Sequence, residues 1–262
     1  MKTTEFNSLK YYQFDQYPFS LVSHGFFTRN GGVSPKPWSS LNLSTTGGDS
    51  RENVIENRAR IFQAIGRPLD SLYDTWQVHG TKIIETNSPR GLDNEPEQAD
   101  GIITTNPEVT LFMRFADCVP LFFIDKNLKV AGIAHAGWKG TIQRIGEKMV
   151  ELMVNNYGLL AKDISVGIGP CISRDKYQIK NDVLLHIKEK FPDNWNDAIS
   201  RQGSNLFFDL AKMNEIILKR VGVKDIFCAN ICTASNLTEW FSHRGENGAT
   251  GRYAAFITTG KP

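Results

Sequence analysis

The chain has 262 residues, of which 40% are hydrophobic and 22% are charged, and its formal net charge at pH 7 is +2. This composition suffices for a sizeable core, and so small a positive excess gives no reason to expect nucleic acid or an acidic membrane surface as a partner. The start has no apolar region of the secretory type, and no apolar run approaches the ~20 residues that cross a bilayer, so we expect a cytoplasmic protein.

The amino-terminal segment is predicted to be a strand or arm that packs on the body, because residues 1–20 are rich in tyrosine and phenylalanine. A tight loop should follow at Arg29, since Gly31 and Gly32 come directly after it. Such a loop can turn backbone N–H groups toward an anion, with Arg29 adding donors. A simple turn with a solvated arginine fits the same residues, and the two interpretations stay open.

One helix is predicted over residues 51–65, where apolar side chains recur at helical spacing and Asp49 or Ser50 can cap the start. Residues 70–85 are predicted to be strand. Residues 87–99 should form a long loop of the kind that lines the rim of a site.

The middle of the chain, residues 110–140, combines short apolar runs with chemically reactive side chains. Strands are predicted over residues 100–105, 111–115, 121–124 and 129–134. A single amphipathic helix should run from about Trp138 to Met153, with Gly158 closing it. The free N–H groups at its start, beside Lys139, are suited to holding an anion such as phosphate.

The carboxy-terminal part is predicted to continue the mixture of strands and helices. Strands are expected over residues 164–168, 226–232 and 253–257, and helices over 183–191 and within 206–221. Four cysteines in a chain of this length do not resemble a disulfide framework, and Cys228 and Cys232 are interpreted as free thiols. With no repeat and no linker, we expect one α+β domain over residues 1–262, with at least eight strands and four or five helices.

Three residues stand out as candidates for catalysis and metal binding: His79 in a possible strand-edge loop, and Cys118 and His135 at the ends of apolar runs. Two imidazoles and one thiolate would give a zinc ion three ligands and leave a fourth position open, as in catalytic sites. Cys118 acting as a nucleophile with either histidine as its base is a second interpretation, and three buried structural residues are a third. Asp117 could orient a ligand histidine or cap a turn.

These residues lie within a series of motifs that extends over almost the whole chain. The motifs are SHGFFTRNGGVS (23–34), SLN (40–42), ENRAR (56–60), QVHG (77–80), ADG (99–101), ADCVP (116–120), HAGWKG (135–140), IGPCI (168–172), CT (232–233), FSHR (241–244) and TGR (250–252). With this series the chain resembles the YfiH-like family. Its members were once called multicopper polyphenol oxidases or laccase-domain proteins and were later assigned as purine nucleoside phosphorylases, and one bacterial member is linked to peptidoglycan editing.

The resemblance implies mixed β-sheets flanked by helices, layered α/β/β/α, and one zinc ion held by His79, Cys118 and His135. It also implies phosphorolysis of adenosine, inosine, guanosine and methylthioadenosine, together with adenosine deamination. The expected partners are then small molecules, namely a purine nucleoside and phosphate, and the chain is expected to be a monomer or a homodimer. Copper is the alternative metal, because it outcompetes zinc at nitrogen–sulfur sites of matching geometry.

Three further residues are candidates for contact with the substrate or phosphate. Arg29 with its glycine loop and Lys139 at the helix start are each suited to phosphate, and Cys171 either lines the pocket or is a structural thiol. The chain also departs from the family pattern at His243 and Gly245, which places a change at the rim of the site.

Other functions remain compatible with the same residues. A cysteine hydrolase or amidase would use Cys118 and His135, with a role in peptidoglycan quality control, and a non-catalytic binding module would retain only the fold. A multicopper oxidase fits poorly, because none of the five histidines is two residues from another.

Overall fold

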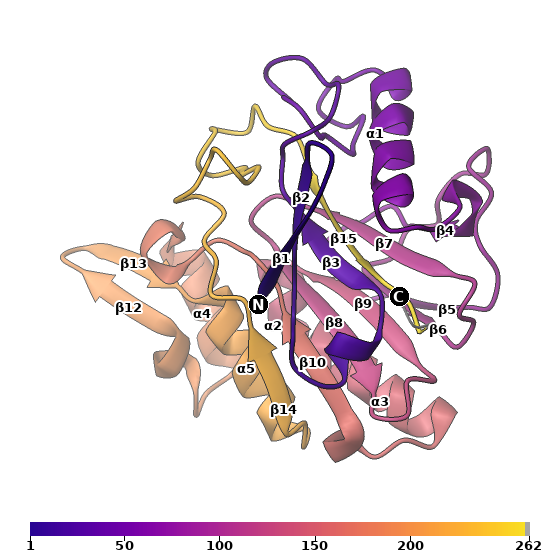
Figure 1. The fold of residues 1–262 in the computed structure, drawn as a ribbon. Coiled ribbons are helices and arrows are strands. Elements are labelled where there is room, and N and C mark those ends of the chain that lie inside the picture. Colours follow the sequence, from indigo (N-terminus) through magenta and orange to yellow (C-terminus); the bar gives the residue numbers. More distant parts are fainter. Residues whose placement is uncertain (260–262) are drawn as a thin grey trace.

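The computed structural model describes residues 1–259, and two stacked six-stranded sheets form its centre (Figure 1). In spatial order, the first sheet contains β1 (Lys2–Phe6), β2 (Leu9–Gln13), β3 (His24–Phe27), β15 (Tyr253–Ile257), β7 (Thr110–Phe115) and β4 (Leu72–Tyr73). The second sheet contains β14 (Asp225–Cys228), β10 (Ile164–Ile168), β8 (Val119–Asp125), β9 (Ala131–Ala136), β6 (Gly101–Thr104) and β5 (Ile83–Thr86). Both sheets are mixed, because each combines antiparallel and parallel pairs.

Helices cover the outer faces of the two sheets. The α-helices are α1 (Arg51–Ala64), α2 (Trp138–Ile142), α3 (Ile145–Tyr157), α4 (Asn181–Lys190) and α5 (Leu210–Arg220). A small third sheet consists of β11 (Gln178–Ile179), β13 (Asn205–Phe208) and β12 (Ile199–Gln202). Short 3₁₀ turns cover Phe19–Leu21, Leu69–Ser71, Ala161–Asp163, Arg174–Lys176 and Trp195–Ala198. No helix among the described residues is long and apolar enough to cross a membrane.

The alternation of side chains along β8 shows how the layers are held together. Phe122 and Ile124 belong to the core between the two sheets, whereas Leu121 and Phe123 belong to the core beneath α3 and α5. A strand buried on both faces has no polar side, which explains the continuous apolar sequence. A third core lies between α1 and the outer face of the first sheet. The order is therefore helix, sheet, sheet, helix, which confirms the predicted α+β architecture.

Most predicted elements are present, with several differences in their limits. The capped helix is α1, and the Ser50 hydroxyl accepts a hydrogen bond from the Asn53 N–H at 3.2 Å. The third central strand begins later than predicted, at Ala131. The cause is the buried carboxylate of Asp125, which accepts the N–H groups of Lys129 and Val130 and holds them in a turn.

The single helix predicted from Trp138 is wrong. It consists of α2 and α3, separated at Arg144, whose φ of 60° lies in the left-handed region. The Arg144 side chain is held there by a hydrogen bond to the Lys190 carbonyl and by stacking over the Phe191 ring. Because Lys190 and Phe191 are distant from Arg144 in the chain, the local sequence does not indicate that the helix is interrupted there.

Two other predicted segments are shorter or divided. The strand predicted over 226–232 ends at Cys228, and Cys232 makes only an isolated bridge with Cys171. Residues 70–85 form the separate strands β4 and β5, and the segment between them enters the candidate site. The segment 206–221 holds most of β13 before α5 begins.

A buried histidine in the core between the sheets predicts an acid-sensitive fold. The His24 Nε2 atom accepts the Phe14 N–H at 2.9 Å, and Nδ1 lies 3.1 Å from the Val22 carbonyl, to which it donates. Burial lowers the pKa of His24 from 6.5 to about 4, against a smaller raising by Val22. At a pH between these two pKa values, His24 is therefore protonated in the unfolded chain and neutral in the folded chain. Stability contributed by neutral His24 should be complete above pH 6.5 and fall by about 3 kcal/mol toward pH 4.

Urea unfolding across this pH range measures the effect. His24→Gln should flatten the pH dependence of the unfolding free energy, whereas His186→Gln, which changes an exposed side chain on α4, should leave it as it is. Parallel pH curves for the wild type and His24→Gln would contradict the prediction.

Candidate active site

His79, Cys118 and His135 lie together in the structure, although they are far apart in the chain. Their ligand atoms all lie within 4.8 Å of one another, and Cys118 Sγ is 3.9 Å from His79 Nε2. The pairing of β8 with β9 places Pro120 opposite His135, so the residue that leads into β8 approaches the end of β9. Two of the three positions therefore follow directly from strand register.

Asp100 fixes the third position and was not identified from the sequence. The residue precedes β6, which pairs with β9, and its carboxylate accepts a hydrogen bond from His135 Nδ1 at 2.8 Å. The same carboxylate accepts the backbone N–H groups of Val78, His79 and Gly80 at 2.7–3.2 Å. One carboxylate thus holds the His79 loop and leaves His135 Nε2 facing the cluster. A carboxylate behind a histidine is typical of metal ligands, which is the signal that could have revealed it.

The electrostatics of the cluster favour a deprotonated sulfur. Burial raises the pKa of the Cys118 thiol, but His135 and His79 outweigh it and lower this pKa to about 6. Burial lowers the pKa of His135, whereas Cys118 and Asp100 raise it to about 9. A thiolate beside two imidazoles is a donor set that suits zinc or copper.

The space around the cluster also fits a small bound group. A Cβ added to Gly137 would lie 2.9 Å from His79 Cδ2 and 3.0 Å from Cys118 Sγ. Only glycine therefore leaves the three donors free to close, which gives the glycine of the HAGW motif a steric role. The three residues fit a single metal ion held by three protein ligands.

Asp117 serves the loop and not the ligands. Its carboxylate accepts hydrogen bonds from the hydroxyl groups of Thr233 and Ser242, each at 2.7 Å, and from the Arg244 N–H at 2.6 Å. The residue has a φ of 86°, so these contacts stabilise a left-handed turn directly before Cys118. Of the two predicted roles for Asp117, the turn is correct, and Asp100 orients the histidine instead.

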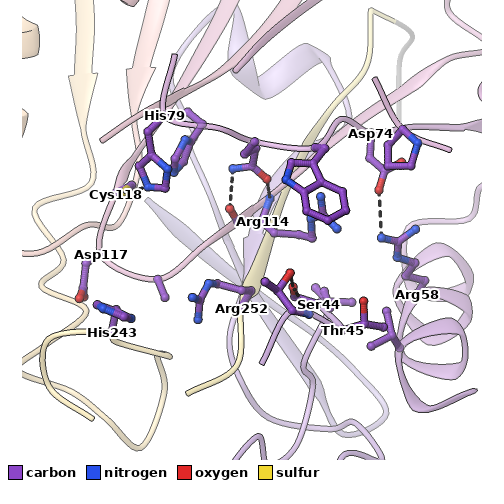
Figure 2. Close-up of a pocket in the computed structure, with 18 of the residues that line it drawn as sticks. Ser44, Thr45, Arg58, Asp74, His79, Arg114, Asp117, Cys118, His243 and Arg252 are labelled. Atoms are coloured by element: carbon purple, nitrogen blue, oxygen red, sulfur yellow. Dashed lines mark hydrogen bonds and ion pairs between the residues drawn. The ribbon is translucent and has the colours of Figure 1, made fainter. Parts of the chain in front are cut away.

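The cluster opens into a cavity of about 670 Å³. Figure 2 shows His79 and Cys118 at one end and Asp74 with Arg58 at the other. Trp76, Trp138 and Tyr177 give the cavity aromatic surface, and His243, where the chain departs from the family pattern, also lines it. A cavity of this size is within the range of small-molecule sites.

The cavity is rich in arginine, a feature that the sequence did not suggest. It is lined by six arginines and two aspartates, namely Arg51, Arg58, Arg90, Arg114, Arg244, Arg252, Asp74 and Asp117. The buried Asp74 binds Arg58 at 2.9 Å and Arg90 at 2.6 Å. The remaining excess of positive charge favours an anionic ligand.

Arg29, Lys139 and Cys171 do not line this cavity. Arg29 is buried, and its guanidinium donates to the Ser39 and Leu237 carbonyls and to the Glu246 carboxylate. These contacts tie distant loops together and place Arg29 neither in solvent nor at this cavity, so neither of its two open interpretations describes its position.

Lys139 is exposed on α2, and its Nζ lies 5.8 Å from the centre of the Trp138 ring. Burial raises the pKa of the Cys171 thiol well above its usual value, and this side chain packs in the core beside the helices. Of the two roles predicted for Cys171, the structural thiol is the one that the structure supports.

The chain is similar in sequence and in fold to known proteins. Residues 23–260 match a family model described as multi-copper polyphenol oxidoreductase laccase. A purine nucleoside phosphorylase of Deinococcus radiodurans is 36% identical over 92% of this chain and 90% of its own length. Purine nucleoside phosphorylase YlmD of Bacillus subtilis is 35% identical over 90% of this chain and 88% of its own. The crystal structure of YlmD from Geobacillus stearothermophilus superimposes with a TM-score of 0.92 at 30% identity, covering 98% of both chains.

Proposed function

The chain belongs to the YfiH-like family, whose model carries the laccase description, and from this premise we propose that it is a metal-dependent purine nucleoside phosphorylase. The proposed substrates are adenosine, inosine, guanosine and methylthioadenosine, each with phosphate. We further propose that residues 1–262 form one catalytic domain, of which 260–262 lie outside the described part, and that it acts in the cytoplasm as a monomer or homodimer.

The observation that carries this proposal is the position of the three-donor cluster at one end of an arginine-rich cavity. His79, Cys118 and His135 would hold the ion, and we propose zinc, with copper as the alternative for the same donors. When bound, the ion supplies a Lewis acid that polarises a substrate atom or lowers the pKa of water. Asp100 would keep His79 and His135 in place.

The cavity residues can bind both substrates of a phosphorolysis. In that reaction a phosphate oxygen bonds to C1′ of the ribose while the bond from C1′ to N9 breaks. The electron pair stays on the purine, which takes the proton of hydrogen phosphate and leaves as the free base. Trp138 and Tyr177 offer stacking surface for the purine, and the arginines inside the cavity, away from the exposed Arg51 at its rim, offer charge for the phosphate.

Adenosine deamination is the second proposed activity, in which water replaces the C6 amino group and ammonia leaves. Zinc deaminases use a glutamate to move the proton. No glutamate among residues 1–259 lines the cavity, and its two aspartates are engaged in hydrogen bonds or ion pairs. We therefore expect deamination to be slower than phosphorolysis.

An amidase or hydrolase is the competing proposal, because the lowered pKa of Cys118 beside His135 also suits a metal-free nucleophile. A copper-dependent polyphenol oxidase is the function that the family description names. Neither of these two activities would release a free purine base in a phosphate-dependent reaction, which distinguishes them from the phosphorylase.

The proposed function predicts phosphate-dependent release of free base from the four nucleosides, with one metal ion per chain in the same sample. Base release should rise with phosphate and saturate, because phosphate is a substrate, and ribose 1-phosphate should form in equal amount. A metal-loaded protein that releases base at the same rate without phosphate would contradict phosphorolysis. Amide cleavage by a metal-free sample, blocked by alkylation of Cys118, would favour the amidase.

A further inference from the structure

Four of the six cavity arginines have their guanidinium groups engaged by other side chains. Asp74 compensates two of them, an exposed aspartate compensates the third, and an aromatic ring covers the fourth. These are Arg58 and Arg90 with Asp74, Arg51 with Asp93 at 3.7 Å, and Arg244 over the Tyr177 ring. Arg114 and Arg252 remain, and neither has a carboxylate partner among residues 1–259.

Arg252 is rigidly placed and incompletely bonded. Its N–H donates to Asn42 Oδ1 at 2.9 Å, and its carbonyl accepts the Leu43 N–H at 3.1 Å. The guanidinium uses only Nη1, which donates to the Thr250 and Gly251 carbonyls. No acceptor within residues 1–259 binds Nε or Nη2, so one edge of the guanidinium is available to a ligand.

Arg114 is the second available cation and lies on the strand that leads to Cys118. Its Nη2 donates to the Thr75 carbonyl at 2.6 Å, and within the described chain its Nε and Nη1 have no acceptor. Burial lowers the pKa of Arg114, Asp74 raises it, and Arg58, Arg90 and Arg252 lower it, so that together they bring this pKa to about 10. This mutual repulsion is relieved when an anion binds between the cations.

The two arginines occupy the middle of the cavity. Burial lowers the pKa of Arg252, while Cys118 and Asp117 raise it, which shows that the guanidinium lies within electrostatic reach of the cluster. Figure 2 shows Arg252 and Arg114 between the His79–Cys118 end and the Asp74–Arg58 end.

We propose that Arg252, with Arg114, binds the phosphate co-substrate. The assignment rests on the proposed phosphorylase function and replaces Arg29 and Lys139 as its phosphate ligands. Two uncompensated guanidinium groups match the two negative charges of hydrogen phosphate, and the free edge of Arg252 can donate two hydrogen bonds to phosphate oxygens. The position near the cluster leaves room for a nucleoside beside the anion.

The test is steady-state kinetics of the metal-loaded Arg252→Gln variant with inosine and inorganic phosphate. The KM for phosphate should rise about 10- to 100-fold, the loss expected for charge-assisted hydrogen bonds, while the KM for inosine at saturating phosphate changes less than about threefold. Arg252→Lys keeps the charge but loses the fork, and should raise the phosphate KM by a smaller factor. It also supplies the test if Arg252→Gln does not fold.

Arg51→Gln is the matched control, because it removes one charge from the cavity rim, where the Arg51 side chain is 65% exposed. It should change the phosphate KM less than about threefold. An equal rise in Arg51→Gln, an unchanged phosphate KM in Arg252→Gln, or equal rises for phosphate and inosine would overturn the assignment. The bound anion could be free inorganic phosphate or the phosphate group of a nucleotide, and binding of inosine 5′-monophosphate distinguishes the two. If Arg252→Gln weakened binding of that nucleotide alone and not of inorganic phosphate, the assignment would also be overturned.

Calorimetry separates failure of the subsite from failure of the proposed function. If the wild type shows no phosphorolysis, the function fails, but titration with inorganic phosphate still tests the subsite. Phosphate that binds the metal-loaded wild type and binds Arg252→Gln at least about tenfold more weakly would support the assignment. No phosphate binding to the wild type would overturn it.

Discussion

Replacing Cys118 by alanine is expected to remove the metal ion and to lower kcat/KM for phosphorolysis by more than about 100-fold. Loss of a residue that merely supports a metal ligand already costs about 10- to 100-fold in affinity or activity, and Cys118 is the only sulfur in the cluster. The two remaining imidazoles would leave half of a tetrahedral site empty. Metal content and kinetics measured on the same preparation check the result.

Cys228→Ala is the control for this change, because Cys228 is a half-buried cysteine on the edge strand β14, outside the cavity. It should retain the metal and nearly all activity. A Cys118→Ala protein that keeps one metal ion per chain and wild-type kcat/KM would contradict the assignment of the cluster.

The cluster could be predicted in part from the places where apolar runs of the sequence end. Cys118 and His135 each terminate an apolar run, and strand ends are where a sheet presents side chains to a cleft. A carboxylate behind a ligand histidine can be expected in general, but its assignment to Asp100 depends on the register of β6 against β9 and on four hydrogen bonds to one carboxylate. No periodicity within the sequence records that register.

The arginines of the cavity illustrate a second limit. Arg58 lies on a helix with many polar residues, where a solvated side chain is the ordinary expectation. Arg114 carried a usable signal, since it interrupts the apolar run TLFMRF of a strand that the structure buries almost completely. A charge within such a strand must find a partner or a ligand. The partner set, however, comes from loops distant in the chain.

The glycine loop after Arg29 shows that a tight turn can be predicted from the sequence although the direction of its arginine side chain cannot. A Cβ on Gly32 would lie 2.2 Å from the Ser40 carbonyl oxygen and 2.5 Å from Asn57 Oδ1, so close packing explains this glycine. Gly31 has a φ of 91°, which explains the other one. The loop does turn tightly, but the Arg29 side chain points toward Leu237 and Glu246 and not toward the cavity.

Asp74→Ala should have the largest effect on stability, lowering the free energy of unfolding by about 3–5 kcal/mol. The carboxylate is 1% exposed, and its partners Arg58 and Arg90 are 10% and 9% exposed. Removing the anion leaves both guanidinium groups buried without compensation and adjacent to Arg114. The loss of stability therefore comes from burying two unpaired guanidinium groups and not from the net contribution of the ion pairs. Urea denaturation monitored by circular dichroism measures it.

Asp225→Ala provides the comparison, because it breaks an ion pair with Lys126 at 3.4 Å in which both side chains are well exposed, at 42% and 37%. Such surface pairs contribute at most about 1 kcal/mol. Equal small losses for Asp74→Ala and Asp225→Ala would mean that water reaches the arginine end of the cavity freely. In that case Arg58 and Arg90 would be as available to an anion as Arg114 and Arg252. A large difference between the variants instead supports a cavity in which Asp74 neutralises one end and leaves the middle for phosphate.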